Sequence, residues 1–246
     1  MNTPDELFDR IKDILGSSPE NMSILEDIVS IDVQVEYYER VAELRCAEPI
    51  NSYSSDDLLS NRLSANEVQD FLIQLAGTDE VENYRLIEKY VASAPEELKE
   101  WGLMALNESR FHLVSSLSDD SGVFISTGLG GKDGKLRYFV VFVPRNSDFS
   151  NEHVKLVVDE VNFIFPRYMS VVEQIEILDC FVCVTALIPM GVAVNEPIKA
   201  VVDECLSLGC LLSDGYIVTN VKQLSLDEIQ KVLNHEPVDG MPFEEQ

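Results

Sequence analysis

The sequence predicts an α+β protein, with a helical N-terminal half and a C-terminal half built on an antiparallel sheet. Two observations support this division. Apolar residues recur three and four residues apart almost throughout residues 4–117, which is the spacing of amphipathic helices. From Ser121 onward they gather instead in short runs of strand length. We therefore expect an all-helical domain over 1–117, an α+β domain over 118–235 and a flexible acidic tail over 236–246.

The first helices are marked by their end signals. Pro4 opens a helix that Gly16 ends, and Pro19 begins a short second helix. A third helix runs from Ile31 to Ala47 and stops before Pro49. It carries a helical stripe that is apolar apart from Arg45 and consists of Val35, Tyr38, Ala42 and Arg45 beside Ile31, Val41 and Leu44.

Three more helical patterns complete the N-terminal half. Ser64, with Glu67 three residues later, forms a capping box that starts the first of them. The segments Val81–Ser93 and Pro95–Leu117 include the run PEELKEWGLMAL and resemble one unit of a HEAT-type repeat. The resemblance implies a helical hairpin, whereas an ordinary helical bundle explains the same stripes. In both arrangements Trp101 belongs to the core.

The C-terminal half mixes strands and helices. The predicted order is strand 121–127, loop 128–135, strand 136–144, helix 150–166, strands 172–178 and 180–189, helix 195–208, strand 214–221 and helix 225–233. Without the first strand, the βαββαβ order over 136–221 resembles the ferredoxin-like fold. That resemblance implies that the first and third strands lie centrally and the second at an edge. The sequence agrees, because 172–177 mixes polar with apolar residues while 136–143 and 180–188 are apolar on both faces.

The first strand, the central hairpin and the second face of the sheet each raise a structural question in this half. Strand 121–127 fits the scheme poorly, and two successive ββα units are the alternative arrangement. A tight hairpin at Leu178-Asp179 joins the two middle strands. Two helices cover only one face of the sheet, so the opposite face needs another cover. That face carries either Arg137, Phe139 and Val141 or Leu136, Tyr138 and Val140. We expect the helical half to cover it, with a homodimer as the second option.

Composition narrows the class of partner. The chain carries 44 acidic and 18 basic side chains, a formal net charge of −26, so we expect neither nucleic acid nor a membrane surface as a partner. The start lacks the pattern of a secretory signal. The longest nearly apolar run, Cys180–Val194, is too short and interrupted to span a bilayer. Five irregularly spaced cysteines favour reduced thiols and a cytoplasmic location.

Basic residues around the glycine-rich loop 128–135 form the one candidate binding site. The loop fails the Walker A spacing, since Leu129 stands where a glycine is needed and Leu136 follows the lysine. It reads as a hairpin loop with its turn at Asp133-Gly134. Four basic side chains nonetheless gather here and could bind an anion or pair with the protein's own acids: Lys132, Lys135, Arg137 and Arg145.

Other reactive residues form no recognisable site. Cys180 and Cys183 have C-x-x-C spacing, but on a strand they point to opposite faces, so these cysteines and the downstream Cys205 and Cys210 read as small core residues. The histidines are far apart, at positions 112, 153 and 235. We therefore predict no catalytic residue, no metal and no cofactor.

The sequence favours a non-enzymatic cytoplasmic protein that binds another protein, as an adaptor or regulator, through the helical half or the groove between the halves. Its acidic surface suits a basic partner. A second hypothesis is a small-molecule sensor, because the C-terminal half resembles the ferredoxin-like domains of ACT regulators. A third is an enzyme with its site between the halves, around residues 128–145.

Overall fold

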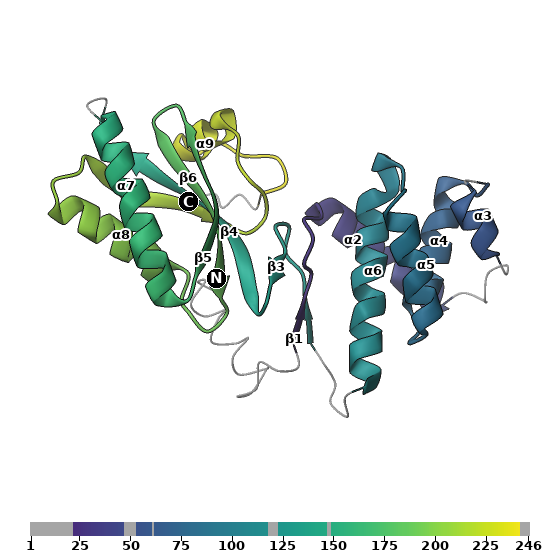
Figure 1. The fold of residues 1–246 in the computed structure, drawn as a ribbon. Coiled ribbons are helices and arrows are strands. Elements are labelled where there is room, and N and C mark those ends of the chain that lie inside the picture. Colours follow the sequence, from purple (N-terminus) through teal and green to yellow (C-terminus); the bar gives the residue numbers. More distant parts are fainter. Residues whose placement is uncertain (1–21, 47–52, 61, 118–122, 147–148, 242–246) are drawn as a thin grey trace. The chain divides into compact units, whose positions relative to one another are not determined.

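The computed structural model describes residues 22–46, 53–60, 62–117, 123–146 and 149–241. The fold is α+β, with most helices in the N-terminal part and the sheet in the C-terminal part (Figure 1). Contacts divide the described chain into a helical unit within Glu20–Gly128 and a sheet unit from Leu129 onward. The change of sequence period predicts the boundary at residue 117 instead. The difference arises because the strand after that point pairs with a strand at the start of the helical unit.

Two short parallel strands belong to the helical unit. Strand β1 (Met22–Ile24) pairs with β2 (Val123–Ile125), and the Leu25 amide continues the ladder to the Ile125 carbonyl at 2.8 Å. The sequence leaves the partner of the 121–127 strand open. Its described residues pair with β1, so this strand starts neither a hairpin with the 136–144 strand nor a ββα unit. The short helix predicted to begin at Pro19 does not continue into the described residues, because Met22–Ile24 form strand β1. The predicted helix from Pro4 to Gly16 lies outside the described residues.

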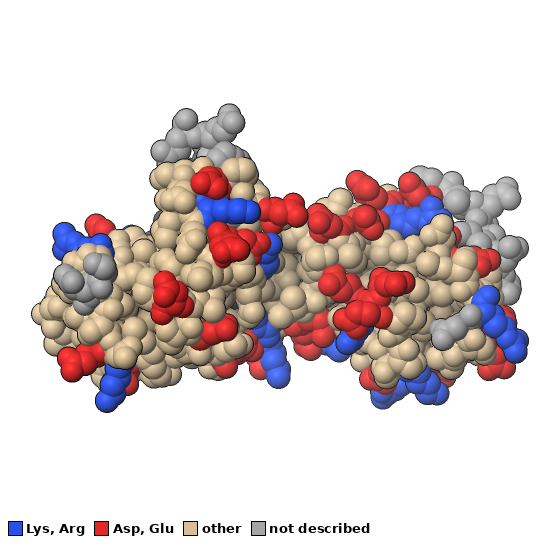
Figure 2. Space-filling view, turned by 90° about the horizontal axis from the view of Figure 1, so that it is seen from above, with Lys and Arg blue, Asp and Glu red and all other residues tan. Residues whose placement is uncertain are grey.

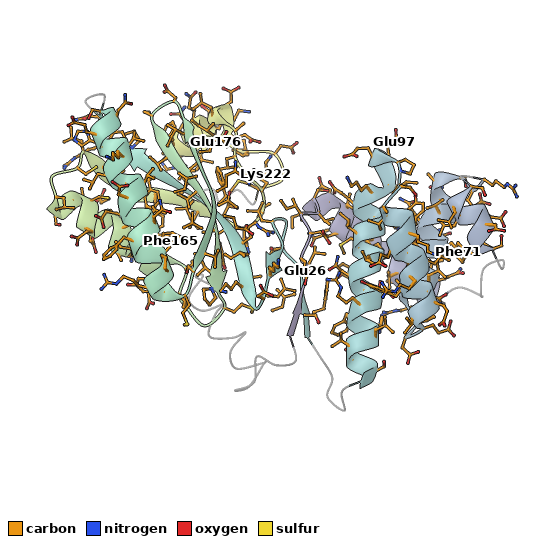
Figure 3. All side chains as sticks on the ribbon, viewed as in Figure 1. Glu26, Phe71, Glu97, Phe165, Glu176 and Lys222 are labelled. Atoms are coloured by element: carbon orange, nitrogen blue, oxygen red, sulfur yellow. The ribbon has the colours of Figure 1, made fainter. Side chains whose placement is uncertain are left out.

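The described part of this unit also contains five helices: α2 (Ile31–Cys46), α3 (Ser55–Leu59), α4 (Ala65–Ala76), α5 (Val81–Val91) and α6 (Glu96–Leu117). The predicted capping box of Ser64 and Glu67 starts α4. Helices α4, α5 and α6 pack on one another, and Gly102 lets α5 approach closely, since a Cβ there would lie 3.0 Å from Val91 Cγ2. Trp101 is buried in the core, as expected, and Phe71 of the same core is labelled in Figure 3.

The sheet unit contains the strands β3 (Gly131–Lys132), β4 (Lys135–Pro144), β5 (Val171–Leu178), β6 (Phe181–Pro189) and β7 (Leu212–Thr219). All pairings are antiparallel, in the order β5-β6-β4, with β7 and β3 on the other side of β4. The first and third long strands, β4 and β6, are thus central and β5 is an edge strand. This confirms the strand placement expected from the sequence.

Two turns of this sheet were predicted from local sequence. Asp133 and Gly134 both have positive φ, 52° and 71°, and connect β3 to β4 as a two-residue hairpin. The hairpin between β5 and β6 lies one residue later than predicted, at Asp179-Cys180, because Leu178 still pairs with Phe181. Asp179 adopts the left-handed conformation, with φ 56°.

Helices α7 (Asn151–Ile164) and α8 (Asn195–Ser207) cover one face of the sheet. The short helix η2 (Phe165–Tyr168) extends α7, and Phe165, fully buried, is labelled in Figure 3. The core on this face includes Val140, Val182 and Val184, none of which is exposed to solvent.

The opposite face of the sheet is covered from within the same unit. Helix α9 (Leu226–Leu233) and the segments around it place Leu224, Ile229 and Val238 against Phe139 and Val141 of β4. The expectation that the helical half or a second subunit covers this face is therefore wrong. The sequence does not predict that the C-terminal segment covers the sheet, because that segment is rich in polar residues. In the fold, Val238 is only 6% exposed and belongs to the core. Residues 236–241 accordingly pack as part of the unit.

Among the described helices, none combines the length and the apolar composition needed to cross a membrane. On the face drawn in Figure 2, Asp and Glu side chains are scattered over both units and outnumber Lys and Arg, as the composition requires.

Candidate functional site

The four basic residues predicted to bind an anion do not converge. Lys132 and Lys135 face each other across the β3-β4 hairpin. Arg145 follows the far end of β4, roughly 33 Å away at about 3.3 Å per residue, where its backbone amide bonds to the Leu211 carbonyl. Only the two lysines at the hairpin remain neighbours.

Arg137 is held by partners inside the protein. Its guanidinium forms a two-point ion pair with Glu173 of β5, with Nη2 at 3.1 Å from Oε1, and donates to the Leu129 carbonyl at 2.6 Å. Glu173 sits at the register shift of β5, which turns its carboxylate toward β4. The pair fixes the glycine-rich loop to the edge strand. Pairing with the protein's own acids, one of the two roles predicted for these residues, applies to Arg137.

The cysteines that the structure describes lie mostly in the core. Cys183 and Cys205 are at most 1% exposed, and burial raises the pKa of each thiol to about 12. The backbone amide of Cys210 donates a hydrogen bond to the Cys205 carbonyl at 2.9 Å. This bond closes the C-terminal end of α8, where Gly209 adopts a positive φ of 80°. Within the described residues, no three His, Cys, Asp or Glu side chains are arranged to hold a metal ion. Burial agrees with the prediction of small core residues. The prediction that Cys180 and Cys183 point to opposite faces is wrong, because Cys180 lies in the β5-β6 turn and packs against the same core as Cys183.

A tyrosine, a glutamate and a histidine meet between α2 and α6, a grouping that the sequence analysis missed. The Tyr37 hydroxyl donates to Glu108 Oε2 at 2.5 Å, and His112 Nε2 lies 3.7 Å from Glu108 Oε1. Burial, followed by the Glu108 charge, raises the pKa of Tyr37 well above its ordinary value. Because Tyr37 is completely buried, no substrate reaches its hydroxyl. We assign this group the role of joining α2 to α6.

The candidate functional site is an exposed apolar row on α2, which we call the α2 stripe and define as Ile31, Val35, Tyr38 and Ala42. Val35 is 50% exposed, Ala42 is exposed and Ile31 is half-buried. Tyr38 is 41% exposed, while its hydroxyl forms a hydrogen bond with the Ser126 side chain. The core instead takes the neighbouring face of the helix, through Tyr37 and Val41. All four belong to the stripe predicted from the sequence, but its other members divide between surface and core: Arg45 is exposed, Leu44 is half-buried and Val41 is buried.

Polar contacts on both sides of the buried face support the orientation of α2. The Gln34 side-chain amide donates to the carbonyls of Val29 at 2.9 Å and Thr127 at 3.1 Å. Arg40, on the other side of the helix, forms a two-point ion pair with Asp70 of α4, with distances of 2.6 and 2.7 Å. Both contacts hold α2 in the rotation that exposes the α2 stripe.

Carboxylates border the α2 stripe on one side. Asp32, Glu36 and Glu39 are exposed and form no ion pair with a residue that the structure describes, whereas Glu43 pairs with Arg40 at 2.8 Å. An α-helix places residues three and four apart on one side, so these acids form a row parallel to the stripe. The surface therefore combines an apolar ridge with a negative border.

Comparison with known protein families gives no match, and comparison with curated proteins gives none either.

Proposed function

We propose that this protein acts in the cytoplasm by binding another protein through the α2 stripe, as an adaptor or regulator without catalysis of its own. The observation that carries the proposal is the exposure of Val35 and Tyr38 on a helix whose neighbouring face is already buried in the core. An exposed apolar row bordered by charge is typical of a surface where a partner docks. Tyrosine is also among the residues enriched at such interfaces.

The acidic border supports a protein partner over other classes of ligand. Nucleic acid and anionic lipid both carry negative charge, which the carboxylates of Asp32, Glu36 and Glu39 oppose. The stripe is a row of side chains along one helix, so it suits a matching protein surface more than a small molecule, which usually binds in a concave pocket.

Capture of the tagged full-length chain from its native extract at moderate salt tests this proposal. Three forms are compared: the wild type, the double variant Val35→Gln/Tyr38→Gln, and the control Val81→Gln. Val81 is 56% exposed on α5 of the same unit, so it matches Val35 in type and exposure. We expect a stoichiometric protein partner with the wild type and the control, and its loss with the double variant. Recovery of the same partner with the double variant, or of no partner at all, would contradict the proposal.

A further inference from the structure

The spacing of the α2 stripe is that of a coiled-coil seam. Ile31, Val35, Tyr38 and Ala42 are separated by four, three and four residues, which is the alternation of the a and d positions of a heptad. The row runs for about 16 Å along the helix, at 1.5 Å per residue. A partner that matches a straight ridge with this period is another helix with the same period, because its side chains then fit between those of the ridge.

The carboxylates occupy the positions that set the choice of partner in such a seam. With Ile31 and Tyr38 as d positions, Asp32 and Glu39 stand at the two e positions, next to the contact surface. Glu36 lies in the row behind them and is also exposed. On the other side of the seam, Gln34 and Val41 are buried. Arg45, at the next d position, is the one exposed basic residue of the row among the described residues of α2, and it lies at the end of the helix. Beside Val35 and Tyr38 the charge that could select a partner comes from Asp32, Glu36 and Glu39 and is negative.

We infer that the occupant of the α2 stripe is a basic amphipathic helix of the partner protein, with apolar residues at heptad spacing and Lys or Arg beside them. The inference rests on the proposed function and names the chemistry of its partner. Long basic side chains cover apolar surface with their methylene groups while their charged ends meet Asp32 and Glu39. A second copy of this chain is excluded as the occupant by charge. Two antiparallel copies would bring their e-position carboxylates together, and each chain has a net charge of −26.

Four synthetic peptides test the chemistry on the full-length protein. Three share one helical heptad pattern of apolar residues and carry Lys, Gln or Glu at the flanking positions. The fourth has the composition of the Lys peptide in an order that removes the heptad spacing. We expect the Lys peptide to bind at least tenfold more tightly than each of the others, measured by fluorescence anisotropy. Its affinity should fall steeply between 0.05 and 0.5 M salt, because exposed charges are screened.

Two pairs of variants locate the binding. Val35→Gln/Tyr38→Gln should abolish binding of the Lys peptide, and Glu36→Lys/Glu39→Lys should weaken it at least tenfold. The control Glu82→Lys/Glu97→Lys changes the net charge equally on α5 and α6 and should leave the affinity unchanged. Circular dichroism of every variant checks that the fold is intact.

The outcomes separate this inference from the proposed function. Equal binding of the scrambled or Gln peptide, equal weakening by the control charge reversals, or failure of the whole peptide set would overturn the basic-helix inference. The proposed function would still stand if a captured partner depended on Val35 and Tyr38. It would fail on its own if capture showed no such partner.

Discussion

Strand β6 and helix α2 are both apolar on two faces, yet the structure treats them differently. Every β6 residue from Phe181 to Ile188 is buried, because α7 and α8 cover one face of the sheet and α9 covers the other. Helix α2 has one face in the core of the helical unit and presents its second apolar face, around Val35 and Tyr38, to solvent. Apolar residues on both faces of an element therefore indicate full burial only when other segments of the same chain pack against both faces. Where the chain covers one face, the second face is available to a partner.

The largest change in stability is expected from a substitution in α9, the helix that packs on the second face of the sheet. Ile229 of α9 is completely buried in the core that contains Phe139 and Val141. We expect Ile229→Ala to lower the free energy of unfolding by about 2–5 kcal/mol, because it leaves a cavity in that core. Urea denaturation measures the change, and hydrogen exchange of the β4 and β6 amides locates it. The neighbouring exposed residue supplies the control, since Gln230→Ala should change stability by less than about 0.5 kcal/mol. A similar effect of both substitutions would show that α9 is not the cover.

A smaller effect is expected from the ion pair that holds the start of α9. Glu228 accepts from Lys222 Nζ at 2.6 Å and caps the helix with Ser225, and these contacts lower its pKa from 4.5 to about 2. Because the folded-state pKa is depressed, the stabilisation is present above about pH 4.5 and is lost as the pH falls toward 2. We expect Glu228→Gln to cost about 1–2 kcal/mol at pH 7, after allowance for the partial exposure of both side chains.

The pH dependence distinguishes this ion pair from ordinary helix contacts. Thermal denaturation from pH 7 to pH 2 should show the difference between the wild type and Glu228→Gln shrinking toward acid. Asp227→Asn is the control, because Asp227 is exposed in the same first turn of α9. A difference that stays constant with pH would contradict the assignment of the stabilisation to the charge of Glu228.

The smallest effect concerns the two faces of α2 itself. Val35 and Val41 lie on one helix but are 50% and 6% exposed. We expect Val41→Ala to lower the free energy of unfolding by more than about 1 kcal/mol and Val35→Ala to change it by less than about 0.5 kcal/mol. The single tryptophan, Trp101, lies in the core of the helical unit, so its fluorescence follows the unfolding of this unit during urea titration. Equal decreases in the free energy of unfolding would show that both faces of α2 contribute to the folded state. That result would contradict the assignment of the α2 stripe as a surface free to bind a partner.

Local sequence signals predicted many of the elements, and pairing between distant residues accounts for the differences. Apolar runs and turn residues located β4, β6 and the hairpin at Asp133-Gly134, because strand period and positive φ are properties of neighbouring residues. The strand near residue 121 was found, but its partner stayed undecided. Its true partner, β1, lies about 100 residues earlier and is too short to give a strand signal of its own.

The candidate site shows the same limit. The sequence contains the row of Val35, Tyr38 and Ala42 as plainly as it contains the core row, and periodicity gives both the same weight. Tertiary contacts distinguish the two rows: Tyr37 and Val41 pack in the core, and the bonds of Gln34 to Thr127 and of Arg40 to Asp70 fit the same rotation of the helix. Similarly, Lys132, Lys135, Arg137 and Arg145 cluster in sequence, but an extended strand separates Arg145 from the rest and Glu173 pairs with Arg137.

The sequence by itself determined the α+β class, the excess of negative charge and the positions of most helices and long strands, because these depend on composition and on neighbours within a few residues. Only the tertiary structure decided which apolar surfaces are covered. It placed α9 and Val238 over the second face of the sheet and left the α2 stripe exposed. The physical reason is that an apolar surface is buried by whatever the whole chain brings against it, and that contact depends on residues far apart in the sequence.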